Sequence, residues 1–187
     1  MKLKSEMRSS LLEQIRSISL DDRQERSLRI QSFLKQKLQD RQGVWAGYQA
    51  LTDERSLDWR QVAPQVTWCF PVVQNLTMEF VRDGQDWGIS ALGVREPQKG
   101  FVVLPEQIQG YVIPAVGFDR QGYRLGRGRG YYDRFLAQCQ QIKIGICFAS
   151  SLCDELPHDE HDLRCDWIIT ENGLVKTSTQ KGDIKWS

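Results

Sequence analysis

The spacing of hydrophobic residues in the first forty positions predicts two amphipathic helices. Four apolar residues recur at intervals of three or four and share one helical face: Met7, Leu11, Ile15 and Ile18. Ser19 followed by Asp22 is typical of a new helix start, because a serine side chain can accept a hydrogen bond from the amide three residues later. A second apolar stripe then comprises Ile30, Phe33, Leu34 and Leu38. We expect residues 4–40 to form an N-terminal helical segment.

Beyond Gly43 the pattern changes to short apolar runs separated by turn residues. Six runs are predicted strands: 44–48, 66–70, 76–81, 111–113, 144–148 and 167–170. Two further segments, 56–63 and 131–141, are predicted helices. We expect Pro71 to end the second strand, and the polar residues after about Val175 to form a loose tail. Strands alternating with helices predict an α/β sandwich with a largely parallel sheet.

Composition and charge narrow the class of protein. Lys and Arg total 25 against 24 Asp and Glu, which is unlike a surface built throughout to attract nucleic acid or anionic lipid. No run of about 18 apolar residues predicts a membrane span, and residues 1–8 lack the apolar core of a signal peptide. None of the five cysteines forms a Cys-x-x-Cys pair. We therefore expect a cytoplasmic protein with reduced thiols and a single domain, 1–187.

The segment 112–134 runs from a predicted strand, through a loop rich in glycine and arginine, into a predicted helix. Its alternating residues are Gly126, Arg127, Gly128, Arg129 and Gly130, with Arg124 just before them. Glycines let backbone amides approach an anion closely, and guanidinium groups match phosphate oxygens. The spacing fits neither the Walker motif nor the dinucleotide fingerprint. The pattern favours a polyphosphate site; a solvated surface loop and an RNA-binding segment are the alternatives.

Carboxylates near this loop are candidate metal ligands. Asp133 follows the loop, and Asp162 precedes the strand predicted at 167–170. Mg²⁺ prefers a few carboxylates together with phosphate oxygens, so these two residues could hold it beside a bound polyphosphate. His158 and His161 lie three positions apart and could bind a transition metal. With no third ligand motif nearby, a structural role for both histidines is favoured.

Two weaker candidates lie in the first third of the chain. Lys4 and Arg8 share a helical face and could clamp a phosphate, although a solvated basic helix end is the simpler interpretation. Glu54 follows the strand predicted at 44–48, and its carboxylate could bind a polar heterocycle. An ordinary turn is the alternative there.

The string from Arg124 to Asp133, RLGRGRGYYD, resembles the signature of the 5-formyltetrahydrofolate cyclo-ligase family. Further strings match that family in the expected order: Lys4-x-x-x-Arg8, 70–72, 78–80, 93–97, 160–162 and 166–170. The resemblance thus extends from Lys4 to about Thr170. It implies a three-layer α/β/α sandwich around a mixed, mostly parallel sheet.

The resemblance also implies an activity. Members of this family convert 5-formyltetrahydrofolate to 5,10-methenyltetrahydrofolate, using ATP and Mg²⁺ and releasing ADP and phosphate through a phosphorylated formyl group. The implied partner is therefore a small folate substrate, with no nucleic acid or membrane involved. We expect a monomer.

Site residues follow from the resemblance by matching position. ATP would be bound by Lys4, Arg8, Arg124, Leu125, Gly126, Arg127, Gly128, Arg129, Gly130, Tyr131 and Tyr132. The folate would contact Gln49, Glu54, Arg127, Gly128, Arg129, Gly130 and Tyr131. Mg²⁺ would be held by Asp133 and Asp162, and Arg124, Arg129 and Tyr131 would be catalytic.

Two other functions remain open from the sequence. Some relatives carry this domain in RNA-binding proteins, and the alternating arginines and glycines suit such a role. Alternatively, the chain is an ATP-dependent enzyme with a different acceptor. Residues 48–57 depart from the family pattern, because Ala50 stands where a serine is usual, and this departure keeps the second alternative open.

Overall fold

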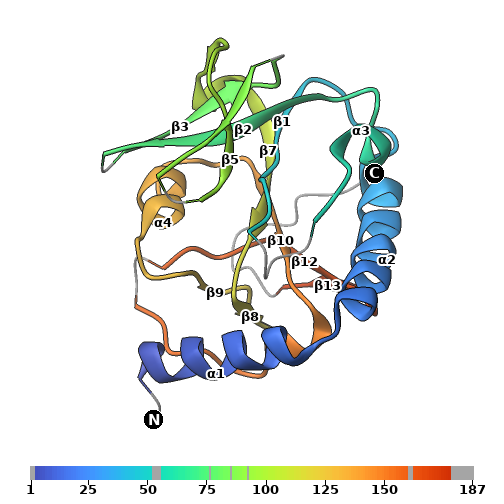
Figure 1. The fold of residues 1–187 in the computed structure, drawn as a ribbon, viewed down its shortest axis with the longest axis vertical. Coiled ribbons are helices and arrows are strands. Elements are labelled where there is room, and N and C mark those ends of the chain that lie inside the picture. The colour runs from blue at the N-terminus through green and yellow to red at the C-terminus, as the bar shows by residue number, and fades with distance from the viewer. Residues whose placement is uncertain are drawn as a thin grey trace.

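The computed structural model describes residues 3–51, 56–75, 77–84, 86–91, 93–159 and 162–177 (Figure 1). Two long helices form the N-terminal segment: α1 (Lys4–Ser17) and α2 (Leu20–Leu38). The Ser19 side chain accepts a hydrogen bond from the Asp22 amide at 3.1 Å, which confirms the predicted start of α2. No helix in these ranges is long and apolar enough to cross a bilayer.

The described residues build an eight-stranded sheet in the order β13-β12-β10-β7-β1-β2-β3-β6. Five neighbouring strands, from β12 to β2, run parallel, whereas β13, β3 and β6 pair antiparallel at the two ends. The predicted mixed, mostly parallel sheet is therefore confirmed. The bounds are β1 (Val44–Ala46), β2 (Thr67–Gln74), β3 (Thr77–Arg82), β6 (Val102–Val103), β7 (Ile108–Pro114), β10 (Ile142–Ile146), β12 (Trp167–Thr170) and β13 (Gly173–Lys176).

Helices cover both faces of this sheet, as the sandwich architecture requires. Helices α1, α2 and the short α3 (Trp59–Val62) contribute to one hydrophobic cluster, and α4 (Tyr131–Leu136) contributes to the other. Successive residues of β7 point to opposite faces, so Val112 joins the first cluster and Ile113 joins the second. The three-layer arrangement is confirmed, with most of the helical mass on the first face (Figure 1).

The order of the parallel strands creates a reversal point at the middle of the sheet. Numbered along the chain, the five parallel strands lie in the order 2-1-3-4-5, with β1 and β7 as the first and third. The chain leaves β1 toward one edge and leaves β7 toward the other. In doubly wound sheets of this kind, ligands bind outside the carboxyl ends of the strands at such a reversal. Residues that follow Ala46 and Pro114 are therefore placed to line a site.

Several short elements complete the fold and were not predicted. Strands β8, β9 and β11 form a three-stranded sheet, and β4 and β5 form a hairpin. Two single 3₁₀ turns, η1 and η2, precede β7 and follow β10. Their bounds are β4 (Trp87–Ile89), β5 (Arg95–Pro97), η1 (Pro105–Gln107), β8 (Gly117–Asp119), β9 (Arg124–Leu125), η2 (Ala149–Ser151) and β11 (Leu152–Cys153).

Pro71 does not end β2, contrary to the prediction. Along β2, the Thr67 amide donates to the Gly43 carbonyl and the Cys69 carbonyl accepts from the Gly47 amide, so alternate residues direct their polar groups toward β1. Pro71 is the next residue in this series, and it lies past the end of β1. Its missing N–H therefore costs no hydrogen bond in the sheet, and the strand continues.

The predicted helix 131–141 is shorter in the structure. Helix α4 ends at Leu136, because the chain needs the following residues to turn back into β10 at Ile142. At the other end, β13 continues to Lys176 by pairing with β12, and the buried Thr177 hydroxyl donates to the Cys165 carbonyl at 2.6 Å. Of the predicted tail, Lys176 and Thr177 thus belong to the fold, and residues 178–187 lie outside the described residues, so the loose tail stays a prediction.

Gly110→Ala is expected to destabilise the protein by about 1–3 kcal/mol, as overpacking of a core does. A Cβ atom at Gly110 would lie 2.4 Å from Trp45 Cζ3 and 2.6 Å from Ile142 Cγ2, between the strands that flank β7. Urea unfolding would measure the loss as a lower midpoint. Gln109→Ala, at an exposed position of the same strand, is the control and should stay within about 0.5 kcal/mol of the wild type. Equal midpoints for the two variants would contradict this packing argument.

Candidate functional site

A cleft of about 620 Å³ lies at the reversal point of the sheet. Tyr48 and Gln49, just after β1, line it together with Pro114 and Ala115 at the end of β7. This volume is in the range of small-molecule and cofactor sites. The cleft therefore lies where the order of the parallel strands predicts a ligand site.

The structure brings the residues predicted from the sequence into this one cleft. Among the described residues, every predicted site residue lines it: Lys4, Arg8, Gln49, Arg124, Leu125, Gly126, Arg127, Gly128, Arg129, Gly130, Tyr131, Tyr132, Asp133 and Asp162. Glu54, the remaining candidate, lies outside the described residues. The arginines and lysine gather with the two aspartates in what we call the charged half of the cleft.

Two glycines shape the loop between β9 and α4. Gly128 has φ +92° and Gly130 has φ +66°, both in the left-handed region that side chains with a Cβ rarely adopt. A Cβ at Gly130 would also lie 2.8 Å from Arg134 Nη1. Helix α4 has only six residues, so we expect its dipole to add little to the positive charge of the arginines beside it. The glycines supply the turn and the arginines supply the charge.

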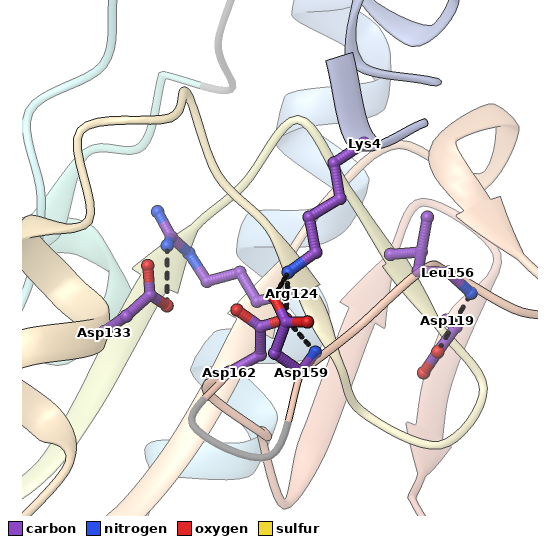
Figure 2. Close-up of polar contacts among 7 residues, drawn as sticks. All are labelled: Lys4, Asp119, Arg124, Asp133, Leu156, Asp159 and Asp162. Atoms are coloured by element: carbon purple, nitrogen blue, oxygen red, sulfur yellow. Dashed lines mark hydrogen bonds and ion pairs between the residues drawn. The ribbon is translucent and has the colours of Figure 1, made fainter. Parts of the chain in front are cut away.

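Helix α1 is attached to this loop and to a distant segment by its two cations. Arg8 Nε donates to the Gly126 carbonyl at 2.7 Å. Lys4 Nζ donates to Asp159 Oδ2 at 2.6 Å and to Asp162 Oδ2 at 2.5 Å, as Figure 2 shows. Burial alone would lower the pKa of Lys4, but the hydrogen bonds with both aspartates outweigh it and raise the pKa, so the side chain stays charged.

Arg124 is held firmly beside Asp133. Its Nε donates to the Pro114 carbonyl at 3.0 Å, and its Nη1 lies 3.5 Å from Asp133 Oδ1. The guanidinium group also lies 4.9 Å from the centre of the Tyr132 ring. Only 8% of the Arg124 side chain is exposed. Figure 2 shows the guanidinium directed at the Asp133 carboxylate. This arginine is therefore preorganised at the base of the charged half.

A buried carboxylate outside the cleft, that of Asp119, connects the turn before β9 with the segment that leads to Asp159. Asp119 Oδ1 accepts hydrogen bonds from the Gln121 and Tyr123 amides, each at 2.9 Å. Asp119 Oδ2 accepts one from the Leu156 amide at 3.2 Å, which Figure 2 shows. Asp119 thus fixes the turn before β9 to the chain that leads to Asp159 and Asp162. It is fully buried and acts as a structural anchor.

The histidines predicted to be structural are partly described. His158 stacks on the Tyr123 ring, with ring centroids 3.5 Å apart and an interplanar angle of 25°. That packing favours the structural role for His158, while His161 lies outside the described residues.

The opposite side of the cleft is mainly apolar, and most of its residues were not predicted. We call it the apolar half; it comprises Tyr48, Gln49, Leu51, Pro71, Val73, Met78, Val94 and Glu96. The Tyr131 hydroxyl donates to the Asn75 carbonyl at 3.2 Å, which connects α4 to the turn between β2 and β3. The strings 70–72, 78–80 and 93–97 contain several of these residues and were the available signal in the sequence.

Comparison with known proteins identifies the family. Residues 1–171 match the family model described as the 5-formyltetrahydrofolate cyclo-ligase family. The chain belongs to this family. The solved structure of Aquifex aeolicus 5,10-methenyltetrahydrofolate synthetase is similar, with a TM-score of 0.83, 28% identity, and coverage of 99% of this chain and 98% of that one. For the Mycoplasma pneumoniae synthetase the TM-score is 0.76 at 26% identity, covering 91% and 99%.

Sequence similarity to named relatives is confined to shorter stretches. A 5-formyltetrahydrofolate cyclo-ligase of Mus musculus is 41% identical over 66 residues, which is 32% of this chain and 32% of the mouse protein. The matches to two other cyclo-ligases cover 56% and 59% of this chain, and 56% and 47% of those proteins. The chain thus spans about a third to a little over half of the length of these relatives, although the structural matches cover nearly the whole fold.

Proposed function

We propose that the protein is a 5-formyltetrahydrofolate cyclo-ligase that uses ATP and Mg²⁺ to form 5,10-methenyltetrahydrofolate. The observation that carries the proposal is the two-sided cleft at the reversal point of the sheet. Its charged half suits a polyphosphate and its apolar half suits a flat heterocycle. Family membership supports the same activity.

The proposed reaction needs both halves at once. A formamide oxygen is a poor leaving group, so it first attacks the γ-phosphorus of ATP and ADP departs. Folate N10 then attacks the activated formyl carbon and loses its proton, and phosphate leaves as the carbon–oxygen bond breaks. Phosphoryl transfer of this kind depends on positioning and electrostatic stabilisation. We assign that stabilisation to Arg124 and Arg129, and the positioning of the formyl group to Tyr131.

The donor set in the charged half fits Mg²⁺ bound together with a triphosphate. The described residues contain no group of three or more His, Cys, Asp or Glu side chains that could hold a metal. Asp133 and Asp162 offer two carboxylates, and Mg²⁺ in nucleotide sites commonly takes one or two, with phosphate and water completing its shell. Bound in this way, the ion would supply neutralisation of phosphate charge during transfer.

The remaining assignments follow the same division. Lys4, Arg8 and the segment Arg124–Tyr132 are proposed to bind ATP, with Arg127–Tyr131 also contacting the folate. Gln49 is proposed to bind the folate from the apolar half, and Glu54 remains a prediction from the sequence. A single domain, a monomeric state and a cytoplasmic location also remain predictions.

An absorbance assay tests the proposed function. The purified protein is mixed with 5-formyltetrahydrofolate and MgATP, and the near-ultraviolet band of the methenyl product is followed. We expect the band only in the complete mixture, and not when ATP or Mg²⁺ is omitted. ATP binding without the band would favour an enzyme with another acceptor. A salt-dependent shift with RNA, in a protein that forms no product, would favour the RNA-binding alternative.

A further inference from the structure

The carboxyl groups of the cleft differ in their partners. Of the described residues that line the cleft, Glu96, Asp133 and Asp162 carry carboxyl groups. Asp133 faces Arg124, and Asp162 binds Lys4. Glu96 is only 4% exposed, and no described cation lies within ion-pair distance of it. It belongs to the apolar half, so its function differs from that of the two aspartates.

The surroundings of Glu96 keep its carboxyl group buried, with no described cation beside it. Glu96 lies on β5 opposite Gly88 of β4. Burial raises the pKa of its carboxyl group, and the nearby Ser90 hydroxyl and Val73 backbone offset part of that rise. A carboxylate has about four acceptor sites, so Glu96 can accept hydrogen bonds from a ligand in addition to those from Ser90 and Val73.

The walls around Glu96 indicate what kind of ligand it meets. Pro71, Met78 and Val94 line the same half and present apolar surface to the cleft. A flat heterocycle packed there loses water from the polar groups along its edge, and each N–H that is left without an acceptor weakens binding. The guanidinium and ammonium groups of the charged half cannot accept these hydrogen bonds, because they are donors only. Glu96 supplies a buried acceptor in the apolar half.

We propose that Glu96 is a specificity-determining residue that accepts hydrogen bonds from the N–H edge of the folate ring system. The inference rests on the proposed function and deepens it, because it assigns the recognition of the ring to a side chain that the sequence signature left without a role. It also separates two tasks in the cleft. Asp133 and Asp162 serve the nucleotide and its metal, and Glu96 serves the ring.

Two substitutions at Glu96 test this assignment. Glu96→Met keeps a similar volume but removes the acceptor, so we expect the KM for 5-formyltetrahydrofolate to rise by about 10- to 100-fold, as loss of a buried hydrogen-bond partner does. The kcat should change less than about threefold, because ring contacts bind substrate and transition state alike. Glu96→Gln keeps one acceptor oxygen and should recover most of the affinity. The KM for ATP should stay the same in both variants.

Controls separate ring recognition from a structural role. Glu79→Met changes an exposed glutamate on β3 and should leave both KM values unchanged. Thermal unfolding is measured for each variant, since a merely structural Glu96 would alter the melting temperature without moving the folate KM. Glu96→Asp shortens the side chain by one methylene group, so its carboxylate no longer reaches as far into the cleft. This variant tests the assignment even if Glu96→Met does not fold. It should raise the folate KM by about tenfold.

Direct binding measurements distinguish failure of the Glu96 assignment from failure of the proposed function. Calorimetry with 5-formyltetrahydrofolate and no ATP should show the same loss for Glu96→Met as the kinetics. If the wild type binds folate and forms the methenyl product but Glu96→Met or Glu96→Asp binds folate equally well, the role of Glu96 is overturned and the activity stands. If the wild type neither binds folate nor forms the product, the proposed function is overturned together with this inference.

Discussion

Replacing Asp133 by asparagine is expected to lower kcat/KM for the cyclo-ligase reaction by at least about 100-fold, the usual scale for losing one electrostatic element of a transition-state site. The Asp133 carboxylate lies 3.5 Å from Arg124 Nη1 in the charged half of the cleft. Asparagine keeps the size of the side chain but removes the charge that would bind Mg²⁺ and hold the guanidinium group. Steady-state methenyl formation at varied Mg²⁺ measures the effect, and the apparent Mg²⁺ affinity should fall.

Asp154→Asn is the matched control for this change. Asp154 pairs with Arg120 at 3.2 Å on the surface, and its side chain is 97% exposed. Surface ion pairs of this kind contribute little to stability, so we expect neither activity nor Mg²⁺ dependence to change. If Asp133→Asn and Asp154→Asn turned over equally well, the metal assignment of Asp133 would be wrong.

The charged half was predictable because its information is local in sequence. The alternation of glycine and arginine between Gly126 and Gly130 lies within one loop, and the four-residue spacing of Lys4 and Arg8 defines one helical face. What local patterns could not provide is the ion pair between Lys4 and Asp159, which are 155 positions apart. No role for Asp159 was predicted from the sequence. Such pairs depend on how α1 docks across the end of the sheet.

Most residues of the apolar half, Gln49 excepted, were missed for a related reason. Its residues come from separate elements: Gln49 follows β1, Pro71 and Met78 lie on β2 and β3, and Glu96 lies on β5. No spacing rule relates them, and only the fold brings them together. Strands of two or three residues, such as β5 and β9, are too short for hydrophobic periodicity to reveal.

The parallel part of the main sheet, in contrast, followed closely from the sequence, whereas β6 and β13 were not predicted. Five parallel strands covered on both faces are apolar along their length, and runs such as 144–148 and 167–170 carry that signal. The strand predicted to end at Pro71 continues to Gln74, which shows that proline does not always end a strand. Proline is excluded from a strand only where its N–H would meet a neighbour, and the sequence does not say that β1 ends first.

Lys4→Gln is expected to raise the KM for ATP by about 10- to 100-fold, the scale of a lost hydrogen bond to a charged group. Lys4 lines the charged half, and its ammonium group donates hydrogen bonds to Asp159 and Asp162. Glutamine keeps a donor but loses the charge, which weakens the contact with phosphate and leaves both carboxylates without their cation. The KM for 5-formyltetrahydrofolate should change less than about threefold.

Two further variants decide whether Lys4 binds the nucleotide or only attaches helix α1. Lys4→Arg retains the charge and should recover part of the ATP affinity, whereas Lys35→Gln removes an exposed charge from α2 and should change nothing. Thermal unfolding is recorded alongside, because Lys4 also joins α1 to the segment with Asp159. A Lys4→Gln protein that melts earlier but binds ATP as tightly as the wild type would restrict Lys4 to fastening the helix. Weaker ATP binding at an unchanged melting temperature would place it in the nucleotide site.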